Sequence, residues 1–263
     1  MLELVVAAAL CIATAKALRG GWALAQLPKL DSKVLFLAVI SIVAAVLVFG
    51  PVFGVLIIIA VIIHELGHVM AYRVCGHDDA RFRLIPLLGG VAISNRAPKT
   101  QTDDFFITLM GPAIGLAPMV LAFALSYVLS DVAPVVAVML SAFGMTVAAL
   151  NAFNLLPLYP LDGGRMIRLA TSSLWPAAEL FVAGGMVALL VLLAVVMKSL
   201  IIGLIALMGF QSIRAEAQRR RKPQPMKKAT ALLALAAHIF TLAAFILGAL
   251  PIITAWGSSI RLL

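Results

Sequence analysis

Long runs of apolar residues dominate this chain, and one of them ends in a group of ionisable side chains. Residues 52–63 carry no charge and lead directly into His64, Glu65 and His68. An apolar run of about 20 residues is long enough to cross a bilayer as a helix, and a helix satisfies its own backbone polar groups within lipid. The sequence therefore predicts an α-helical membrane protein that crosses the bilayer several times.

The apolar runs are spread along the whole chain. Of its 263 residues, 63% are hydrophobic and 12% are charged, whereas soluble domains are roughly half apolar and about a quarter charged. The runs lie at 4–18, 34–49, 52–74, 105–129, 132–153, 180–197, 200–213 and 230–253. The first run is predicted to be a short membrane helix, with an interfacial segment as the alternative.

The basic residues are placed as orientation signals. They fall in loops between apolar runs, so the formal net charge of +9 predicts no nucleic-acid partner. With loops assigned to alternate sides, eighteen of the twenty Lys and Arg residues collect on one side, and only Lys198 and Arg261 on the other. The basic side is predicted to be cytoplasmic. We expect a multi-pass protein of a prokaryotic cell (inner) membrane, with its active site near the cytoplasmic face.

His64, Glu65 and His68 have the His-Glu-x-x-His spacing of zinc metalloproteases. On a helix, residues i and i+4 share a face, so both imidazoles can bind one metal ion. Glu65 then lies beside the attacking water as its general base. The structural alternative is a polar packing cluster, which is disfavoured for three such residues in an apolar helix. The motif predicts one Zn²⁺ ion per chain and Glu65 as the catalytic residue.

A catalytic zinc ion needs a third protein ligand, and elimination leaves Asp162. An extended motif would need histidine at position 74, which is valine, and no glutamate lies between Glu65 and Glu179. The other downstream acids are interpreted as turn residues, helix-start residues or residues on the opposite side of the membrane. Asp162 follows Pro157 and Pro160, and a helix broken at membrane depth lines a cavity or is buried in protein. Its structural alternative is a helix cap.

Together these motifs resemble those of the site-2 proteases, zinc enzymes that cut within membranes. The motifs are, in order, His64-Glu-Leu-Gly-His68, Pro86-Leu-Leu-Gly-Gly-Val, Gly111-Pro112 and Asn154-x-x-Pro-x-x-Pro-x-Asp162-Gly-Gly. The chain looks most like compact members that lack PDZ and CBS domains. The resemblance implies a six-helix core, zinc held by His64, His68 and Asp162, and Glu65 as acid and base. It also implies that Asn154 binds the substrate strand, for which a helix-terminating hydrogen bond is the alternative.

The polar segment 73–104 predicts a short β-hairpin or small sheet at the cytoplasmic membrane edge. It has partial alternation of apolar residues and a Gly89-Gly90 turn signal. The strand 86–94 is predicted to hold an unwound substrate segment as an added strand, with Gly89 and Gly90 as substrate-binding residues. We also expect His77 to be an exposed turn residue and the basic segment 214–228 to be a mobile linker.

Three segments are predicted along the chain. Residues 1–33 form an N-terminal membrane helix and basic loop, residues 34–216 the intramembrane metalloprotease core, and residues 217–263 a basic linker and C-terminal membrane helix. The expected function is hydrolysis of a peptide bond in or near the transmembrane segment of a membrane protein, as in regulated intramembrane proteolysis. The expected partners are that substrate, the lipid bilayer and a membrane regulatory protein. The alternatives are a membrane zinc transporter, which needs ligands stepping across the bilayer, and a zinc-binding scaffold.

Overall fold

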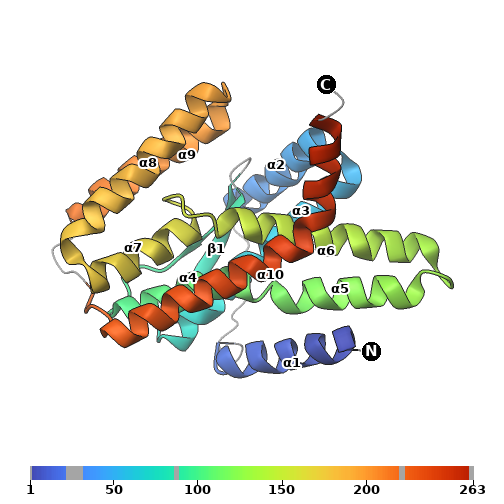
Figure 1. Ribbon diagram of the computed structural model, residues 1–263, viewed down its shortest axis with the longest axis horizontal. Coiled ribbons are helices and arrows are strands. Elements are labelled where there is room, and N and C mark those ends of the chain that lie inside the picture. The colour runs from blue at the N-terminus through green and yellow to red at the C-terminus, as the bar shows by residue number, and fades with distance from the viewer. Residues whose placement is uncertain (1, 22–31, 86–88, 219–222, 261–263) are drawn as a thin grey trace. The chain divides into compact units, whose positions relative to one another are not determined.

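The structure is a computed structural model that describes residues 2–21, 32–85, 89–218 and 223–260 (Figure 1). Its α-helices are α1 (Leu2–Ala17), α2 (Ser32–Phe49), α3 (Pro51–Val74), α4 (Gln101–Ala113), α5 (Leu116–Leu129), α6 (Pro134–Asn154), α7 (Asp162–Leu174), α8 (Glu179–Val196), α9 (Leu200–Ala217) and α10 (Lys228–Ile260). The strands are β1 (Arg81–Ile85) and β2 (Gly89–Ile93), and a short 3-10 helix, η1, covers Pro176–Ala178. The predicted class, helical with a small sheet, is confirmed.

Six segments among the described residues are long and apolar enough to cross a membrane. They are 51–74, 101–129, 134–154, 176–196, 200–217 and 228–250, and α2 adds a shorter apolar stretch. The second of them is two helices, because the chain is interrupted between α4 and α5 beside Pro112 and Gly115, residue types that weaken a helix. The predicted multi-pass membrane protein is confirmed.

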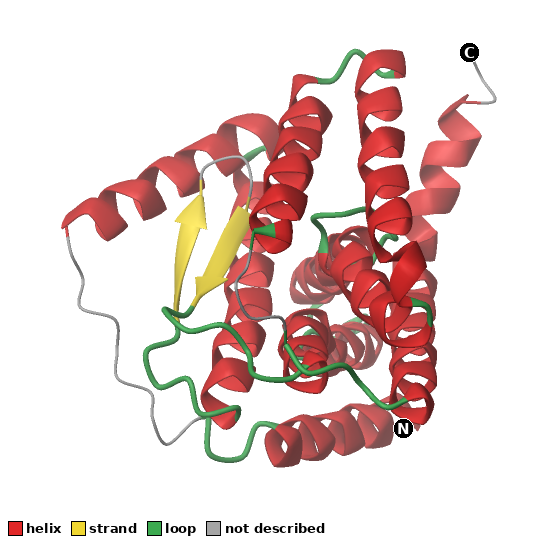
Figure 2. Cartoon of the chain, turned by 90° about the vertical axis from the view of Figure 1, so that its left-hand side faces the viewer, coloured by secondary structure: helices red, strands yellow, loops and turns green. Residues whose placement is uncertain are grey.

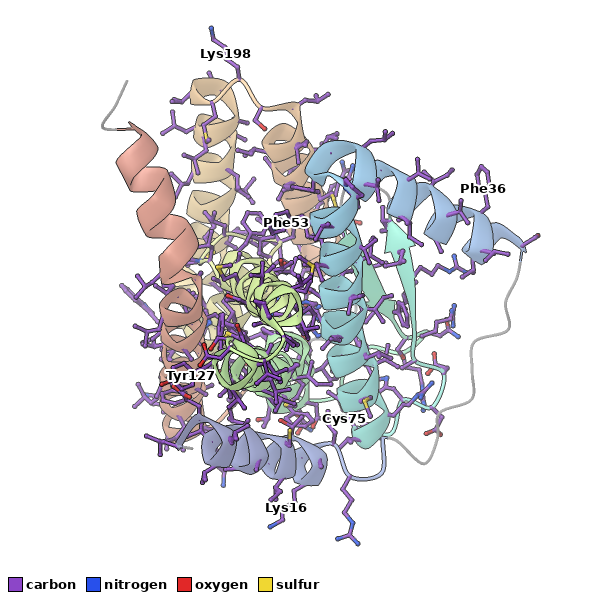
Figure 3. All side chains as sticks on the ribbon, turned by 90° about the vertical axis from the view of Figure 1, so that its right-hand side faces the viewer. Lys16, Phe36, Phe53, Cys75, Tyr127 and Lys198 are labelled. Carbon is purple, nitrogen blue, oxygen red and sulfur yellow. The ribbon has the colours of Figure 1, made fainter. Side chains whose placement is uncertain are left out.

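The chain forms two compact units. The first comprises residues 1–96, 110–152 and 243–263, and the second residues 97–109 and 153–242. Within the first unit, α2 packs on α3, and α1 packs on α5. Figure 3 shows α3 running from Phe53 near its start to Cys75 just past its end, so this helix carries the metal-binding motif in its second half.

β1 and β2 form a two-stranded antiparallel sheet that packs against α3 (Figure 2). Ile85 pairs with Gly89 at the turn end of the sheet. Gly89 has φ +94°, a left-handed conformation that glycine adopts without steric cost. The predicted hairpin is confirmed. The second strand is shorter than the predicted 86–94, of which residues 86–88 lie outside the described residues.

His77 helps to hold the open end of this hairpin. Its side chain is 5% exposed, and its Nδ1 lies 2.9 Å from Oγ of Ser94. The Ser94 hydroxyl also donates to Oδ1 of Asp79 at 3.1 Å, and the N–H of Asn95 donates to Oδ2 of Asp79 at 2.6 Å. The prediction of an exposed turn residue is wrong for His77, because the Tyr72 ring and the end of β2 cover the imidazole.

Acidification is expected to loosen this end of the hairpin. The N–H of Asn95 is the main cause that holds the pKa of Asp79 below its usual value, and Ser94 and Arg96 act in the same direction. A group whose folded pKa lies below its unfolded value of about 3.9 stabilises the fold above that pH, and this stability is lost as the pH falls through the folded pKa. Hydrogen-exchange protection of the Asn95 amide, corrected for the intrinsic rate, should therefore fall between about pH 5 and about pH 2.

The variant Asp79→Asn is the control for this effect. It keeps the shape of the side chain but removes the charge, so the Asn95 amide should already be less protected at neutral pH. Equal protection of that amide in the variant and the wild type at every pH would contradict the assignment.

In the second unit, α8 and α9 lie side by side, and the turn between them carries Lys198 (Figures 1 and 3). α7 lies outside the predicted apolar runs. Arg168 of α7 is 6% exposed, with Nη1 2.6 Å from Oε1 of Glu179 in α8 and Nη2 3.7 Å from Oε1 of Glu216 in α9. This buried arginine therefore ties α7 to both helices of the pair.

The segment after α9 pairs with the chain before α4. The N–H of Gln101 donates to the carbonyl oxygen of Gln224 at 2.8 Å, and the N–H of Gln224 donates to that of Lys99 at 3.0 Å. The prediction of a mobile linker over 214–228 is wrong for its described residues, because residues up to 217 belong to α9 and Gln224 forms these backbone bonds.

Candidate metal centre

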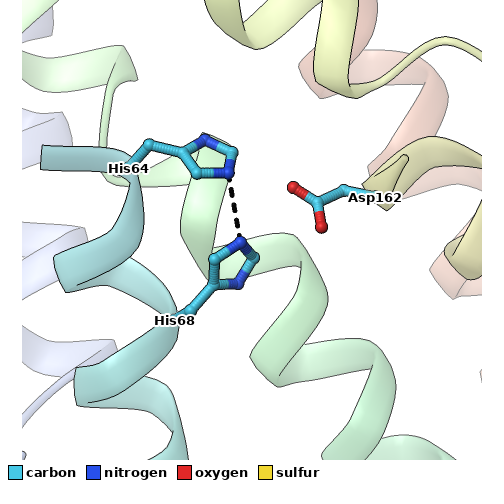
Figure 4. Close-up of side chains that lie close together, drawn as sticks. All are labelled: His64, His68 and Asp162. Atoms are coloured by element: carbon cyan, nitrogen blue, oxygen red, sulfur yellow. Dashed lines mark hydrogen bonds between the residues drawn. The ribbon is translucent and has the colours of Figure 1, made fainter. Parts of the chain in front are cut away.

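α3 carries His64, Glu65 and His68 on a buried stretch of helix. Their exposed fractions lie between 5% and 8%. His64 and His68 lie one turn apart, and their Nε2 atoms are 3.1 Å apart, as the dashed line in Figure 4 marks. The two rings meet edge to face, with centroids 4.8 Å apart. The i, i+4 spacing thus directs both Nε2 atoms to one place, as the sequence predicts.

Two glycines provide the space in which the histidine pair lies. A Cβ at Gly67 would lie 2.1 Å from the carbonyl oxygen of Met110, so α3 and α4 touch through their backbones. A Cβ at Gly111 would lie 2.2 Å from Nε2 of His68, so the imidazole lies directly against the α4 backbone. Close packing at Gly111 therefore helps to set the position of the His68 ring.

Glu65 lies against strand β2. A Cβ at Gly90 would lie 2.4 Å from Cγ of Glu65 and 2.8 Å from its Oε1, so any larger residue at position 90 would displace the carboxyl group. At Gly89 the nearest atom to such a Cβ is Cγ2 of Val61, at 4.0 Å. Both glycines are thus placed beside the motif helix, and their role in binding substrate stays a prediction.

Asp162 is the first residue of α7, and its side chain is partly buried. A Cβ at Gly163 would lie 2.0 Å from the carbonyl oxygen of Leu155, so the start of α7 packs directly on the backbone that follows α6. A negative charge is also stabilised in the first turn of a helix. In the Asp-Gly-Gly sequence, Asp162 therefore places a negative charge at the start of α7, and Gly163 leaves room for the Leu155 backbone.

Asp162 is the third ligand that the sequence predicts beside the two histidines. His64 and His68 each offer a ring nitrogen as a ligand atom, and Asp162 offers a carboxylate oxygen (Figure 4). Zinc–nitrogen bonds of about 2.0–2.1 Å in a tetrahedral site put two ligand nitrogens about 3.3 Å apart, close to the 3.1 Å between the Nε2 atoms. Two imidazoles and a carboxylate are ligands that catalytic zinc takes, with a fourth position left for water. The donor set fits zinc.

Asn151 is a site residue that the motifs do not predict. The predicted substrate-binding residue, Asn154, is the last residue of α6 and is partly buried. Asn151 lies three positions before it on the same helix. Asn151 is 1% exposed, and its Oδ1 lies 2.8 Å from Nδ1 of His64. Its signal in the sequence is an amide within an otherwise apolar run, a placement that favours a functional role.

Several of the acids that elimination set aside have partners elsewhere. Asp104 accepts a hydrogen bond from Arg165, and Glu179 from Arg168. Asp79 binds the end of the hairpin, as described above. These carboxylates are therefore occupied in holding the fold, which agrees with the elimination that left Asp162.

Comparison with known proteins finds similarity over part of the chain. Residues 52–140 match the family model described as peptidase family M50. This stretch of the chain is similar to peptidase family M50. The matched residues include His64, Glu65, His68 and both hairpin glycines, and they end before Asn154 and Asp162. The resemblance to the site-2 proteases is confirmed.

Two curated relatives are similar in sequence to part of this chain. A zinc metalloprotease of Methanocaldococcus jannaschii is 30% identical over 127 residues, 46% of this chain and 34% of that protein. Rip3 of Mycobacterium tuberculosis is 35% identical over 117 residues, 44% of this chain and 30% of that protein. The chain thus spans about a third of the length of these relatives. A solved site-2 protease from M. jannaschii aligns with a TM-score of 0.46 and 21% identity, covering 74% of this chain and 93% of that chain.

Proposed function

We propose that this protein is a zinc metalloprotease that hydrolyses a peptide bond in or next to the transmembrane segment of a membrane protein. The observation that carries the proposal is the His64–His68 pair, whose Nε2 atoms are 3.1 Å apart on a helix apolar enough to span a membrane. Asp162, the acid that elimination leaves in the sequence, would complete the ligand set. The peptidase family M50 match over the same helix supports a proteolytic role.

Glu65 is proposed to be the catalytic acid and base. Bound zinc would lower the pKa of a water molecule and polarise the scissile carbonyl. Glu65 would take the proton from the attacking water and pass it to the leaving amine. The absence of a side chain at Gly90 leaves the space that the carboxyl group occupies beside β2. His64, His68 and Asp162 would hold the metal and leave its fourth position open.

The hairpin is proposed to hold the substrate. A substrate helix satisfies its own backbone groups, so it must unwind locally before a peptide bond is exposed. In the described residues the sheet has two strands, so an unwound segment could pair with the free edge of one of them. Gly89 and Gly90 lie on the strand nearest Glu65, and Asn154 is proposed to hydrogen-bond the backbone of the substrate.

We propose that residues 34–216 form the catalytic core, with further membrane segments at 1–33 and 217–263. The uneven distribution of Lys and Arg supports an active site near the cytoplasmic face of a prokaryotic cell membrane. The helices outside the core are proposed to regulate substrate entry or to bind a membrane regulatory partner.

Cleavage of a membrane-embedded substrate tests the proposed function. The purified full chain in vesicles should cut single-span membrane proteins, and mass spectrometry should map the cut inside or beside the span. The chelator 1,10-phenanthroline should stop cleavage and added Zn²⁺ should restore it, whereas the non-chelating 1,7-isomer should have no effect. Zinc uptake into the vesicles without any cleavage would instead favour the transporter alternative.

A further inference from the structure

We infer that Asn151 positions His64 for the metal by deciding which of its ring nitrogens carries the proton. The inference rests on the proposed function, because it assumes that Nε2 of His64 binds zinc. The two residues are 87 positions apart, on α6 and α3, and both are buried. Their hydrogen bond joins Oδ1 of Asn151 and Nδ1 of His64 at 2.8 Å.

The other end of the Asn151 amide determines its orientation. Nδ2 donates to the carbonyl oxygen of Val147 at 2.8 Å. A carbonyl oxygen can only accept a hydrogen bond, so the amide nitrogen must face Val147 and Oδ1 must face His64. Because Oδ1 is also only an acceptor, Nδ1 of His64 must carry the proton. The lone pair of Nε2 is then left for the metal.

The Gly115 backbone packs closely on the amide, and the hydrogen bonds of its two ends fix its orientation. A Cβ at Gly115 would lie 2.7 Å from Nδ2 of Asn151, so no free space adjoins the amide on that side. A buried amide costs free energy unless its polar atoms are hydrogen-bonded, and both Oδ1 and Nδ2 have partners. The Asn151 side chain is therefore held in one orientation, and its hydrogen bond to Nδ1 orients the His64 ring in turn.

Outer partners of this kind tune metal sites. A histidine that binds a metal usually donates its other ring N–H to a neighbouring acceptor, and loss of that acceptor typically weakens metal binding 10- to 100-fold. The structure assigns this part to the Asn151 amide, which makes it a positioning residue for His64. Peptide cleavage would depend on it only through the metal.

The test measures zinc affinity in purified full-length variants by competition with a chromophoric chelator. Asn151→Leu removes the acceptor and should weaken zinc binding by about 10- to 100-fold. Asn151→Asp keeps an acceptor for the Nδ1 proton and should bind zinc more tightly than Asn151→Leu does. Thr146→Val is the matched control, since Thr146 is a buried residue of α6 whose hydroxyl donates to the Ala142 carbonyl at 2.7 Å. It should bind zinc like the wild type.

Nitrogen NMR of the His64 ring supplies a second readout that does not depend on zinc. In the metal-free wild type the proton should be on Nδ1, and in Asn151→Leu it should be shared between the two nitrogens. A wild-type protein with the proton on Nε2 would overturn the inference, even if the leucine variant fails to fold. Unchanged zinc affinity in a folded Asn151→Leu variant would also overturn the inference. So would a loss of zinc affinity in Asn151→Asp as large as the loss in Asn151→Leu.

His64→Ala separates this inference from the proposed function. Loss of zinc from that variant shows that His64 is a ligand, and the Asn151 variants then decide the positioning role alone. Wild-type zinc affinity in His64→Ala would refute the proposed metal site, and the Asn151 inference with it.

Discussion

Replacing Glu65 with glutamine is expected to lower the rate of peptide cleavage by at least about 100-fold while the protein still binds zinc, because general acid–base catalysis typically contributes 10²–10⁴-fold. Glutamine has the shape of glutamate, so it should fit the space that Gly90 leaves beside Cγ and Oε1. Its amide cannot take a proton from water at neutral pH. The loss should therefore appear in catalysis and not in the fold.

The measurement compares single-turnover cleavage of a membrane substrate with zinc content in the same preparation. Glu3→Gln is the matched control, because it makes the same chemical change at an exposed residue in the first turn of α1. That variant should cleave at the wild-type rate. Wild-type cleavage by Glu65→Gln would show that another group serves as the base.

Replacing Asp162 with alanine is expected to weaken zinc binding by more than about 100-fold, since even the loss of an outer-shell partner costs 10- to 100-fold. The carboxylate is the only one of the three proposed ligands that carries a negative charge. Two imidazoles on one helix would remain, which is fewer than the three protein ligands of a catalytic zinc site. Cleavage should be lost together with the metal.

Zinc stoichiometry after dialysis and chelator competition check this result. Asp103→Ala is a suitable control, because Asp103 is also a partly buried aspartate in the first turn of a helix. It should keep the metal. If Asp162→Ala retained wild-type zinc affinity, Asp162 would not be a ligand, and its place at the start of α7 would be that of a helix cap.

Much of the fold could be predicted from local patterns. The apolar runs predicted the spanning helices because a segment that leaves water must satisfy its own backbone. The partial alternation in 73–104 predicted the hairpin, although Gly89 and Gly90, predicted as its turn, lie in β2. The errors concern contacts that local pattern does not encode. His77 looks like a turn residue until Tyr72 and Ser94 are seen to cover it. Gln224 looks like part of a linker until its backbone is paired with residues about 125 positions earlier.

The same division holds for the metal centre. The sequence by itself determined the His64–His68 pair, because an i, i+4 spacing on any helix brings two side chains to one place. Only the tertiary structure decided that Gly111 packs on the His68 ring, that Gly90 adjoins Glu65 and that Asn151 binds His64. These contacts join different elements of the chain. Their distances depend on how closely helices and strands approach, which no spacing in the sequence specifies.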